Sequence, residues 1–309
     1  MKYLTYSIND EMFLGVLIKN EIINLNKFSK GKIPNCMNLF LNDFENNHLW
    51  VNNNIDKMSY KGIKLDDVIV CAPIPKPNSL RDAYAFREHV VAGRKSRGLE
   101  MIPEYDLFPV FYYSNHNAIS GPGEIFIEKD QAVKLDYELE IAAVIGKKGK
   151  NISVDEADDY IVGYTIMNDL SARALQKEEM KLSLGPAKGK DFLTTIGPFF
   201  VTKDDLRKYC IKSEKGNRYD LGMKAYLNEE LLSEDNFKNI TWTFAEIISR
   251  ISNGTYIYPG DVIGSGTCST GCFLELNQTN KTDIWLEDGD KVNLEIDLLG
   301  NLINTIAYK

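Results

Sequence analysis

Residues 135–146, LDYELEIAAVIG, carry acids at every second position: Asp136, Glu138 and Glu140. Side chains on a β-strand point alternately to its two faces, so the three carboxylates are predicted to share one face. Buried without partners, such charges would cost several kcal/mol each. A divalent cation removes that cost, and ligands that are all oxygen select a hard ion such as Mg²⁺, Ca²⁺ or Mn²⁺. The alternative is an edge strand whose acids face solvent.

A second acidic position follows an apolar run. Residues 160–168 predict a buried strand that leads into Asn168–Asp169, and residues 171–181 predict a helix. An aspartate between a strand and a helix is placed either to cap the helix or to bind a cation. The sequence alone leaves both roles open for Asp169.

The elements that position these acids begin with a small α/β module. Residues 13–54 predict two short strands around a Lys19–Asn20 turn and then a helix. Prolines cluster between residues 73 and 77, which excludes regular structure there and marks a boundary. We therefore predict a small N-terminal domain at residues 1–72 and a second, larger domain at residues 73–309.

The second domain is predicted to be rich in strands. Residues 81–98 and 241–252 predict helices, whereas the rest of this part mainly predicts strands, including one at residues 272–278. The strands do not alternate regularly with helices. The fold class is therefore α+β, with a mixed β-sheet roll or sandwich.

Composition excludes several classes of protein. The 309-residue chain has a formal net charge of −8 and no basic run, so nucleic acid is not an expected partner. No apolar stretch reaches the length of a membrane span, and the first twenty residues lack the apolar core of a signal peptide. The five cysteines show no paired zinc-binding spacing. We expect a cytoplasmic protein with reduced thiols and no membrane partner.

Taken together, the motifs resemble the fumarylacetoacetate hydrolase family. The resemblance covers roughly residues 70–309 and rests on six segments in the family's order: RDAYAFREH (81–89), FPVFYYSNHNAISGPG (108–123), DYELEIAAVIG (136–146), GYTIMNDLSARALQ (163–176), GKDFLTTIGPFFV (189–201) and GSGTCSTGCFLEL (264–276). Each segment is weak alone, whereas the combination is specific. The resemblance implies a mixed β-sandwich roll, a homodimer and one divalent cation per site, with Mg²⁺ preferred and Ca²⁺ or Mn²⁺ as alternatives.

The resemblance also assigns roles to individual residues. It implies that the metal ligands are Asp82, Glu138, Glu140 and Asp169. Asp136 then falls outside the ligand set, and we expect it at the solvated entrance of the strand.

The remaining assignments concern catalysis and substrate binding. The resemblance implies that His89 activates water with Glu275 as its partner, and that Lys190 and Gln176 stabilise negative charge on oxygen. Alternative roles are a surface helix position for His89, a solvent-facing strand acid for Glu275 and a surface turn for Lys190. The implied substrate contacts are Tyr112, Thr267 and Arg97, although Arg94 competes with Arg97 for a substrate carboxylate.

The function implied is metal-dependent hydrolysis of a C–C bond in a β-diketo acid of the fumarylacetoacetate or acylpyruvate type. The main alternative is decarboxylation of a 2-oxo acid such as oxaloacetate, or a related isomerisation, on the same metal site. A third alternative is a non-catalytic, metal-stabilised binding protein. Met180 replaces a substrate-contacting tyrosine of the family pattern, which points to a different distal pocket.

Overall fold

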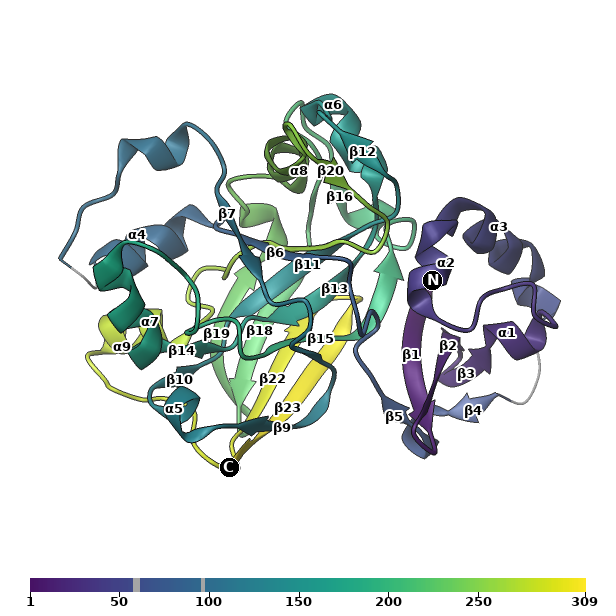
Figure 1. Cartoon of the computed structure of the whole chain (residues 1–309), viewed down its shortest axis with the longest axis horizontal. Helices are drawn as coiled ribbons and strands as arrows, with labels where there is room; N and C mark the ends of the chain where they lie inside the picture. The colour runs from purple at the N-terminus through teal and green to yellow at the C-terminus, as the bar shows by residue number, and fades with distance from the viewer. Residues whose placement is uncertain (58–61, 96–97) are drawn as a thin grey trace.

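The computed structural model describes residues 1–57, 62–95 and 98–309 and contains two large β-sheets (Figure 1). The larger sheet has twelve strands in the order β4-β3-β2-β1-β15-β13-β11-β21-β6-β7, with β5 on β1 and β8 on β15. Its strands are β1 (Lys2–Ile8), β2 (Glu11–Ile18), β3 (Glu21–Asn24), β4 (Ile63–Lys64), β5 (Ile69–Val70), β6 (Leu80–Ala83), β7 (Phe111–Ser114), β8 (Ile119–Ser120), β11 (Leu139–Ile145), β13 (Ile161–Asn168), β15 (Thr194–Thr202) and β21 (Val262–Gly264).

The second sheet has five strands in the order β19-β18-β22-β23-β9. They are β9 (Gly123–Ile127), β18 (Gly222–Leu227), β19 (Glu230–Asn236), β22 (Lys291–Ile296) and β23 (Gly300–Tyr308). Short pairs join β10 (Leu135–Asp136) to β14 (Ser171–Ala172), β12 (Gly149–Lys150) to β20 (Tyr256–Ile257), and β16 (Cys210–Ile211) to β17 (Arg218–Tyr219).

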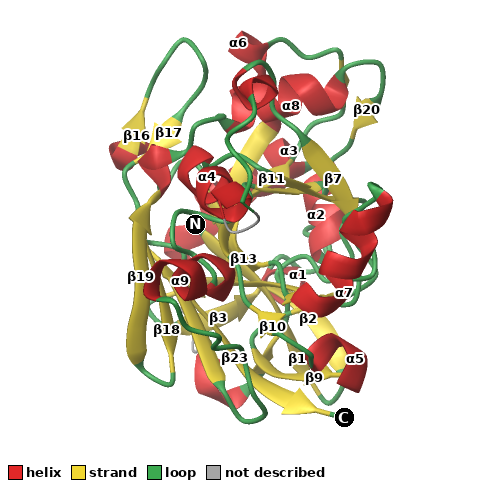
Figure 2. Cartoon of the chain, turned by 90° about the vertical axis from the view of Figure 1, so that its left-hand side faces the viewer, coloured by secondary structure: helices red, strands yellow, loops and turns green. Residues whose placement is uncertain are grey.

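Helices surround the two sheets (Figure 2). They are α1 (Leu25–Phe28), α2 (Met37–Asn42), α3 (Phe44–Asn54), α4 (Arg87–Lys95), α5 (Lys129–Ala132), α6 (Val154–Ala157), α7 (Arg173–Glu179), α8 (Phe244–Ser252) and α9 (Phe273–Asn280). Of these, α2 and α3 cover one face of the larger sheet. None of the helices within the described residues is long and apolar enough to cross a membrane.

The two sheets pack face to face, with β22 and β23 lying across β13 and β15 (Figure 1). The strand β11 is buried on both faces because its alternate side chains enter two different cores. Ile141 and Ala143 belong to the core between the sheets, whereas Ala142 and Val144 belong to the core beneath α2 and α3. This arrangement, with parallel and antiparallel pairs, confirms the predicted strand-rich α+β sandwich.

The N-terminal strands extend the large sheet. The strand β1 pairs with β15, placing Tyr3 opposite Phe200. The predicted Lys19–Asn20 turn is present, and both residues have the positive φ that a tight hairpin turn requires. The division into two domains at residue 72 remains a prediction.

Two predicted elements are wrong. The helix expected from residue 81 begins only at Arg87, because residues 80–83 form β6 and pair in parallel with β21. The strand expected at residues 272–278 is the helix α9. The alternating pattern of that segment is short enough to fit a strand or a helix. The helix is favoured because the carboxylate of Asp136 accepts hydrogen bonds from its first two amides, those of Phe273 and Leu274.

The core between the sheets yields a stability prediction. Phe237 is fully buried and its ring stacks on Tyr219 with the centroids 6.0 Å apart. We expect Phe237→Ala to lower the free energy of unfolding by about 3–5 kcal/mol, because the substitution leaves a cavity. The same change at Phe126, which is 54% exposed, is expected to cost less than about 1 kcal/mol. Urea denaturation of both variants measures the difference, and equal losses would contradict this packing.

Candidate metal centre and active site

Four buried carboxylates meet where the large sheet ends. Asp82 lies on β6, Glu138 lies between β10 and β11, Glu140 lies on β11, and Asp169 follows β13. One oxygen from each lies within 4.8 Å of the others, and none of the four residues is more than 4% exposed. Neighbouring strands bring them together, because β6, β21, β11 and β13 are adjacent in the sheet. The structure therefore groups all of the predicted metal ligands.

A glycine that the sequence analysis did not select makes this approach possible. Gly264 on β21 lies between β6 and β11, opposite Asp82 in the strand pairing. A Cβ at this position would lie 2.4 Å from Oδ1 of Asp82 and 2.9 Å from Oε2 of Glu140. A side chain here would therefore displace at least one carboxylate.

The electrostatics of the cluster favour a bound cation. Neither carboxylate oxygen of Glu140 accepts a hydrogen bond from the described residues, although both are buried. Burial, together with the charges of Asp82, Glu138 and Asp169, raises the pKa of Glu140 well above its usual range. Burial and the charge of Asp169 raise the pKa of Asp82 to about 7. These residues fit a hard divalent cation such as Mg²⁺, Ca²⁺ or Mn²⁺, because all of the donor atoms are oxygens and one carboxylate lacks a partner.

Lys190 and Tyr112 contact the same cluster from one side. The ammonium group of Lys190 donates to Oδ2 of Asp169 over 2.7 Å and also donates to Glu138. The hydroxyl group of Tyr112 donates to Oδ2 of Asp169 as well. Burial alone would lower the pKa of Lys190, but the charges of Asp169 and Glu138 outweigh it and raise the pKa. Lys190 is therefore a fixed positive charge inside the site.

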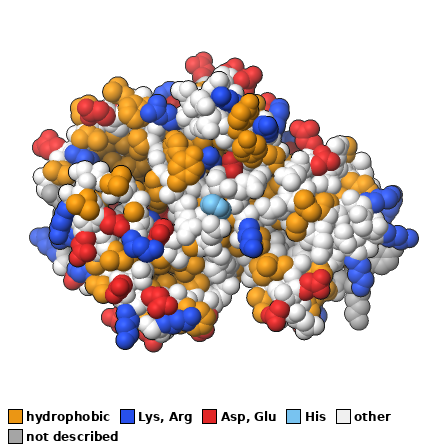
Figure 3. All heavy atoms as spheres, viewed as in Figure 1, with side chains coloured by type: hydrophobic (Ala, Val, Ile, Leu, Met, Phe, Trp, Pro, Cys, Tyr) orange, Lys and Arg blue, Asp and Glu red, His pale blue; other side chains and the backbone are white. Residues whose placement is uncertain are grey.

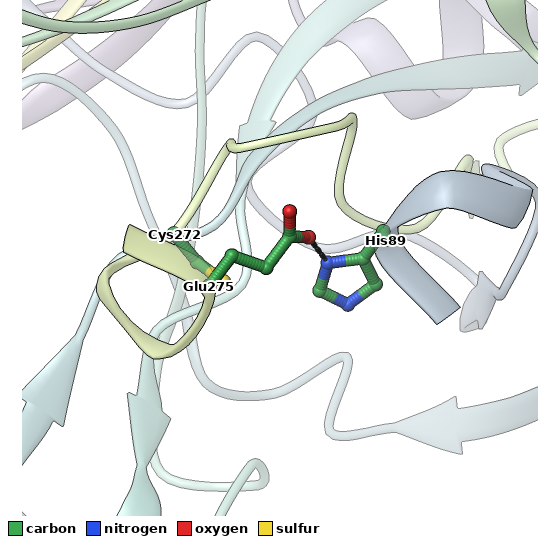
Figure 4. Close-up of side chains that lie close together, drawn as sticks. All are labelled: His89, Cys272 and Glu275. Carbon is green, nitrogen blue, oxygen red and sulfur yellow. Dashed lines mark hydrogen bonds and ion pairs between the residues drawn. The ribbon is translucent and has the colours of Figure 1, made fainter. Parts of the chain in front are cut away.

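His89 and Glu275 form a buried pair between α4 and α9 (Figure 4). Nδ1 of His89 hydrogen-bonds Oε1 of Glu275, and Oε2 of Glu275 accepts the amide hydrogen of Thr270 over 2.7 Å. A neutral imidazole that donates from Nδ1 keeps the lone pair of Nε2 free to accept a proton. Figure 4 shows this second nitrogen pointing away from Glu275.

The His89–Glu275 pair is electrostatically coupled to the carboxylate cluster. Burial alone would raise the pKa of Glu138, but the charges of Lys190, Arg173 and His89 outweigh it and lower the pKa to about 2. The His89–Glu275 pair therefore lies close enough to Glu138 to influence its charge.

Asp136 is not at a solvated strand entrance, and that expectation is wrong. Its side chain is fully buried and accepts hydrogen bonds from the amides of Phe273 and Leu274 at 2.7 and 3.1 Å. It also pairs with Arg173, whose guanidinium reaches Glu138 at 2.7 Å. Asp136 therefore links a predicted metal ligand to the helix that carries Glu275. No local pattern indicated this pairing, because 37 residues separate Asp136 from Arg173.

The other predicted residues occupy different positions around the site. Gln176 accepts a hydrogen bond from Arg173 over 3.0 Å, and the same guanidinium also donates to Glu138. Thr267 is buried in the loop after β21, next to Gly266, whose amide donates to Asp82. Arg97 lies outside the described residues.

Arg94, the alternative to Arg97, lies on α4 beside a cavity of about 220 Å³. The cavity is also lined by Tyr84, Val90, Ile102 and Tyr105 and by three further residues, Glu104, Phe108 and Val110. Figure 3 shows hydrophobic side chains around a recess in this region of the surface.

The carboxylate cluster predicts how stability depends on pH. The folded-state pKa of Asp82, about 7, lies above its ordinary 3.8, so between these values the folded protein holds a proton that the unfolded chain has released. The contribution of this proton to the stability of the folded protein is complete below the ordinary pKa of Asp82 and is lost as the pH rises toward 7. Glu140 and Asp169 act in the same direction, whereas the opposite effect of Glu138 falls between its folded pKa of about 2 and its ordinary 4.5.

We therefore expect the melting temperature of metal-free protein to fall as the pH rises from about 5 to about 8. The increase in melting temperature caused by saturating Mg²⁺ is expected to grow over the same pH range. Calorimetry in EDTA and in Mg²⁺ measures both. A gain from Mg²⁺ that is the same at both ends of the range would contradict the account.

The buried pair of Asp136 and Arg173 predicts a large effect of substitution. Asp136→Asn removes the charge that balances the guanidinium group of Arg173, so we expect the free energy of unfolding to fall by about 3 kcal/mol. Asp283→Asn is the matched control, because Asp283 forms an exposed pair with Lys134, and we expect it to leave the urea midpoint unchanged. A midpoint for Asp136→Asn equal to that of the unsubstituted protein would show that the pair does not stabilise the fold.

Comparison with known proteins places the chain in a family. A family model described as fumarylacetoacetate (FAA) hydrolase C-terminal matches residues 79–307. The fumarylacetoacetate hydrolase domain-containing protein 2 homolog of Dictyostelium discoideum is 30% identical over 313 residues, which cover 99% of this chain and 97% of that protein. Oxaloacetate tautomerase YisK of Bacillus subtilis (strain 168) is 29% identical over 324 residues, covering 99% of this chain and all of the relative.

Solved structures share the fold over the full chain. Maleylpyruvate hydrolase from Sphingobium sp. SYK-6, solved in complex with manganese(II) and pyruvate, has a TM-score of 0.73 at 20% identity and covers 100% of this chain. The alignment includes 99% of that structure's chain. With the match over residues 79–307, these findings confirm the resemblance: the chain belongs to the fumarylacetoacetate hydrolase family.

Proposed function

We propose that this protein is a divalent-metal-dependent hydrolase that cleaves a C–C bond in a β-diketo acid of the fumarylacetoacetate or acylpyruvate type. The observation that carries the proposal is the buried His89–Glu275 pair beside the four-carboxylate cluster. Asp82, Glu138, Glu140 and Asp169 would hold the cation. A cation held by these carboxylates would coordinate and polarise the carbonyl oxygens of the dicarbonyl substrate.

The side chains of the site supply the proton transfers. Glu275 holds His89 in the tautomer whose Nε2 accepts a proton from water, and the resulting hydroxide adds to one carbonyl carbon. The bond between that carbon and the neighbouring carbon then breaks, and its electron pair forms an enolate. Lys190 and Gln176 stabilise the negative charge on oxygen, and the protonated His89 returns its proton to the enolate carbon.

A second candidate is tautomerisation of oxaloacetate, the isomerisation alternative. It is favoured by the relative from Bacillus subtilis, which is named an oxaloacetate tautomerase and matches 99% of this chain. In this reaction His89 would remove a proton from carbon rather than from water. The same charges would stabilise the enolate, so the two candidates differ in whether water attacks.

A substrate panel separates the two candidates. We expect acylpyruvates incubated with Mg²⁺ or Mn²⁺ to yield two carboxylic acid products, detected by chromatography, and Glu275→Gln to lower kcat by about 10²–10⁴-fold. Glu124→Gln changes an exposed acid on β9 and serves as the matched control. Enol–keto conversion of oxaloacetate without C–C cleavage of any β-diketo acid would reject the hydrolase and support the tautomerase. Decarboxylation of oxaloacetate to pyruvate would support the lyase alternative.

A further inference from the structure

Cys272 adds a thiol group to the His89–Glu275 pair (Figure 4). One ligand atom from each of the three side chains lies within 4.8 Å of the other two. Cys272 immediately precedes α9, and Glu275 lies in the first turn of the same helix. His89 comes from α4, which packs against α9. The three side chains are buried, and Cys272 is a free cysteine.

The donor atoms of this group differ from those of the carboxylate cluster. Sulfur, imidazole nitrogen and one carboxylate oxygen are the ligands that Zn²⁺ takes in proteins, whereas Mg²⁺ and Ca²⁺ prefer oxygen alone. We propose that His89, Cys272 and Glu275 form a second metal site that binds Zn²⁺ and thereby inhibits the enzyme. The site is separate from the four-carboxylate cluster, since no residue belongs to both groups.

Binding of Zn²⁺ at this site changes the protonation of Cys272 and of His89. Zn²⁺ displaces the thiol proton of Cys272, which is released to solvent, and ligates the thiolate. At Nδ1 it replaces the hydrogen bond to Glu275, so the neutral imidazole carries its proton on Nε2. An imidazole protonated at Nε2 cannot take a proton from water or from carbon. The inhibition, but not the binding, rests on the catalytic role of His89 in the proposed function.

Metal binding can be tested without any assay of turnover. The protein is first saturated with Mg²⁺ to fill the carboxylate cluster and is then titrated with Co²⁺, a spectroscopic substitute for Zn²⁺. We expect a sulfur-to-cobalt charge-transfer band in the near ultraviolet, which oxygen ligands alone do not produce. The band should be abolished by Cys272→Ala and by Cys272→Ser, and circular dichroism checks that each variant is folded.

Cys268→Ala is the matched control, because Cys268 is also a fully buried free thiol four positions earlier and does not belong to the group. It should retain the band, and Zn²⁺ should remove the band by competition. Absence of the band in the unsubstituted protein, or its persistence in both folded Cys272 variants, would overturn the site.

Inhibition is then measured as the ratio of turnover with and without Zn²⁺ within each variant, at saturating Mg²⁺. We expect the Zn²⁺ concentration for half-inhibition to rise about tenfold or more in Cys272→Ala and to stay unchanged in Cys268→Ala. Relief of inhibition by more Mg²⁺, with equal sensitivity in all variants, would place Zn²⁺ in the carboxylate cluster and overturn the proposed inhibition. If no substrate is turned over, the proposed function fails while the cobalt spectrum still decides whether the metal site exists.

Discussion

The mutual repulsion of four buried carboxylates is the constraint on which the rest of this structure depends. Negative groups removed from water and placed this close are stable only with compensating positive charge. Lys190 and Arg173 compensate on the side of Glu138 and Asp169. Glu140 has no such partner among the described residues, so the compensation inside the protein is incomplete. A divalent cation would complete it, and this requirement would tie the stability of the fold to the proposed chemistry of the site.

The geometry of the sheet makes this arrangement specific. Gly264 lets β6 and β11 bring their carboxylates together, and the loop after it fixes Asp82 through the amide of Gly266. Asp136 extends the network to α9, so the position of Glu275 relative to Glu138 depends on one buried carboxylate and one guanidinium. The predicted metal ligand Glu138 and the helix that carries Glu275 are therefore joined in one hydrogen-bonded unit, although they lie far apart in the sequence.

Much of this could be predicted from the sequence, and the failures have physical reasons. The strands β11 and β13 have strong apolar patterns, and their acidic ends marked Glu140 and Asp169 as candidate ligands. The family resemblance assigned both to one ligand set, and the structure brings them together. The helix α9 was mistaken for a strand because its alternating residues fit both structures, and the Asp136 carboxylate that caps it comes from another segment. Arg173, Gly264 and Cys272 were missed because their roles arise from contacts across the fold, which no local pattern records.

The most direct test of the account is anomalous diffraction from crystals of this protein soaked with Mn²⁺. We expect one strong peak per chain, in contact with carboxylate oxygens of Asp82, Glu138, Glu140 and Asp169, and no such peak in crystals of a Glu140→Gln variant. A peak elsewhere, or a cluster that excludes Mn²⁺ while Lys190 stays paired with Glu138 and Asp169, would contradict the claim that these carboxylates are held together by a cation.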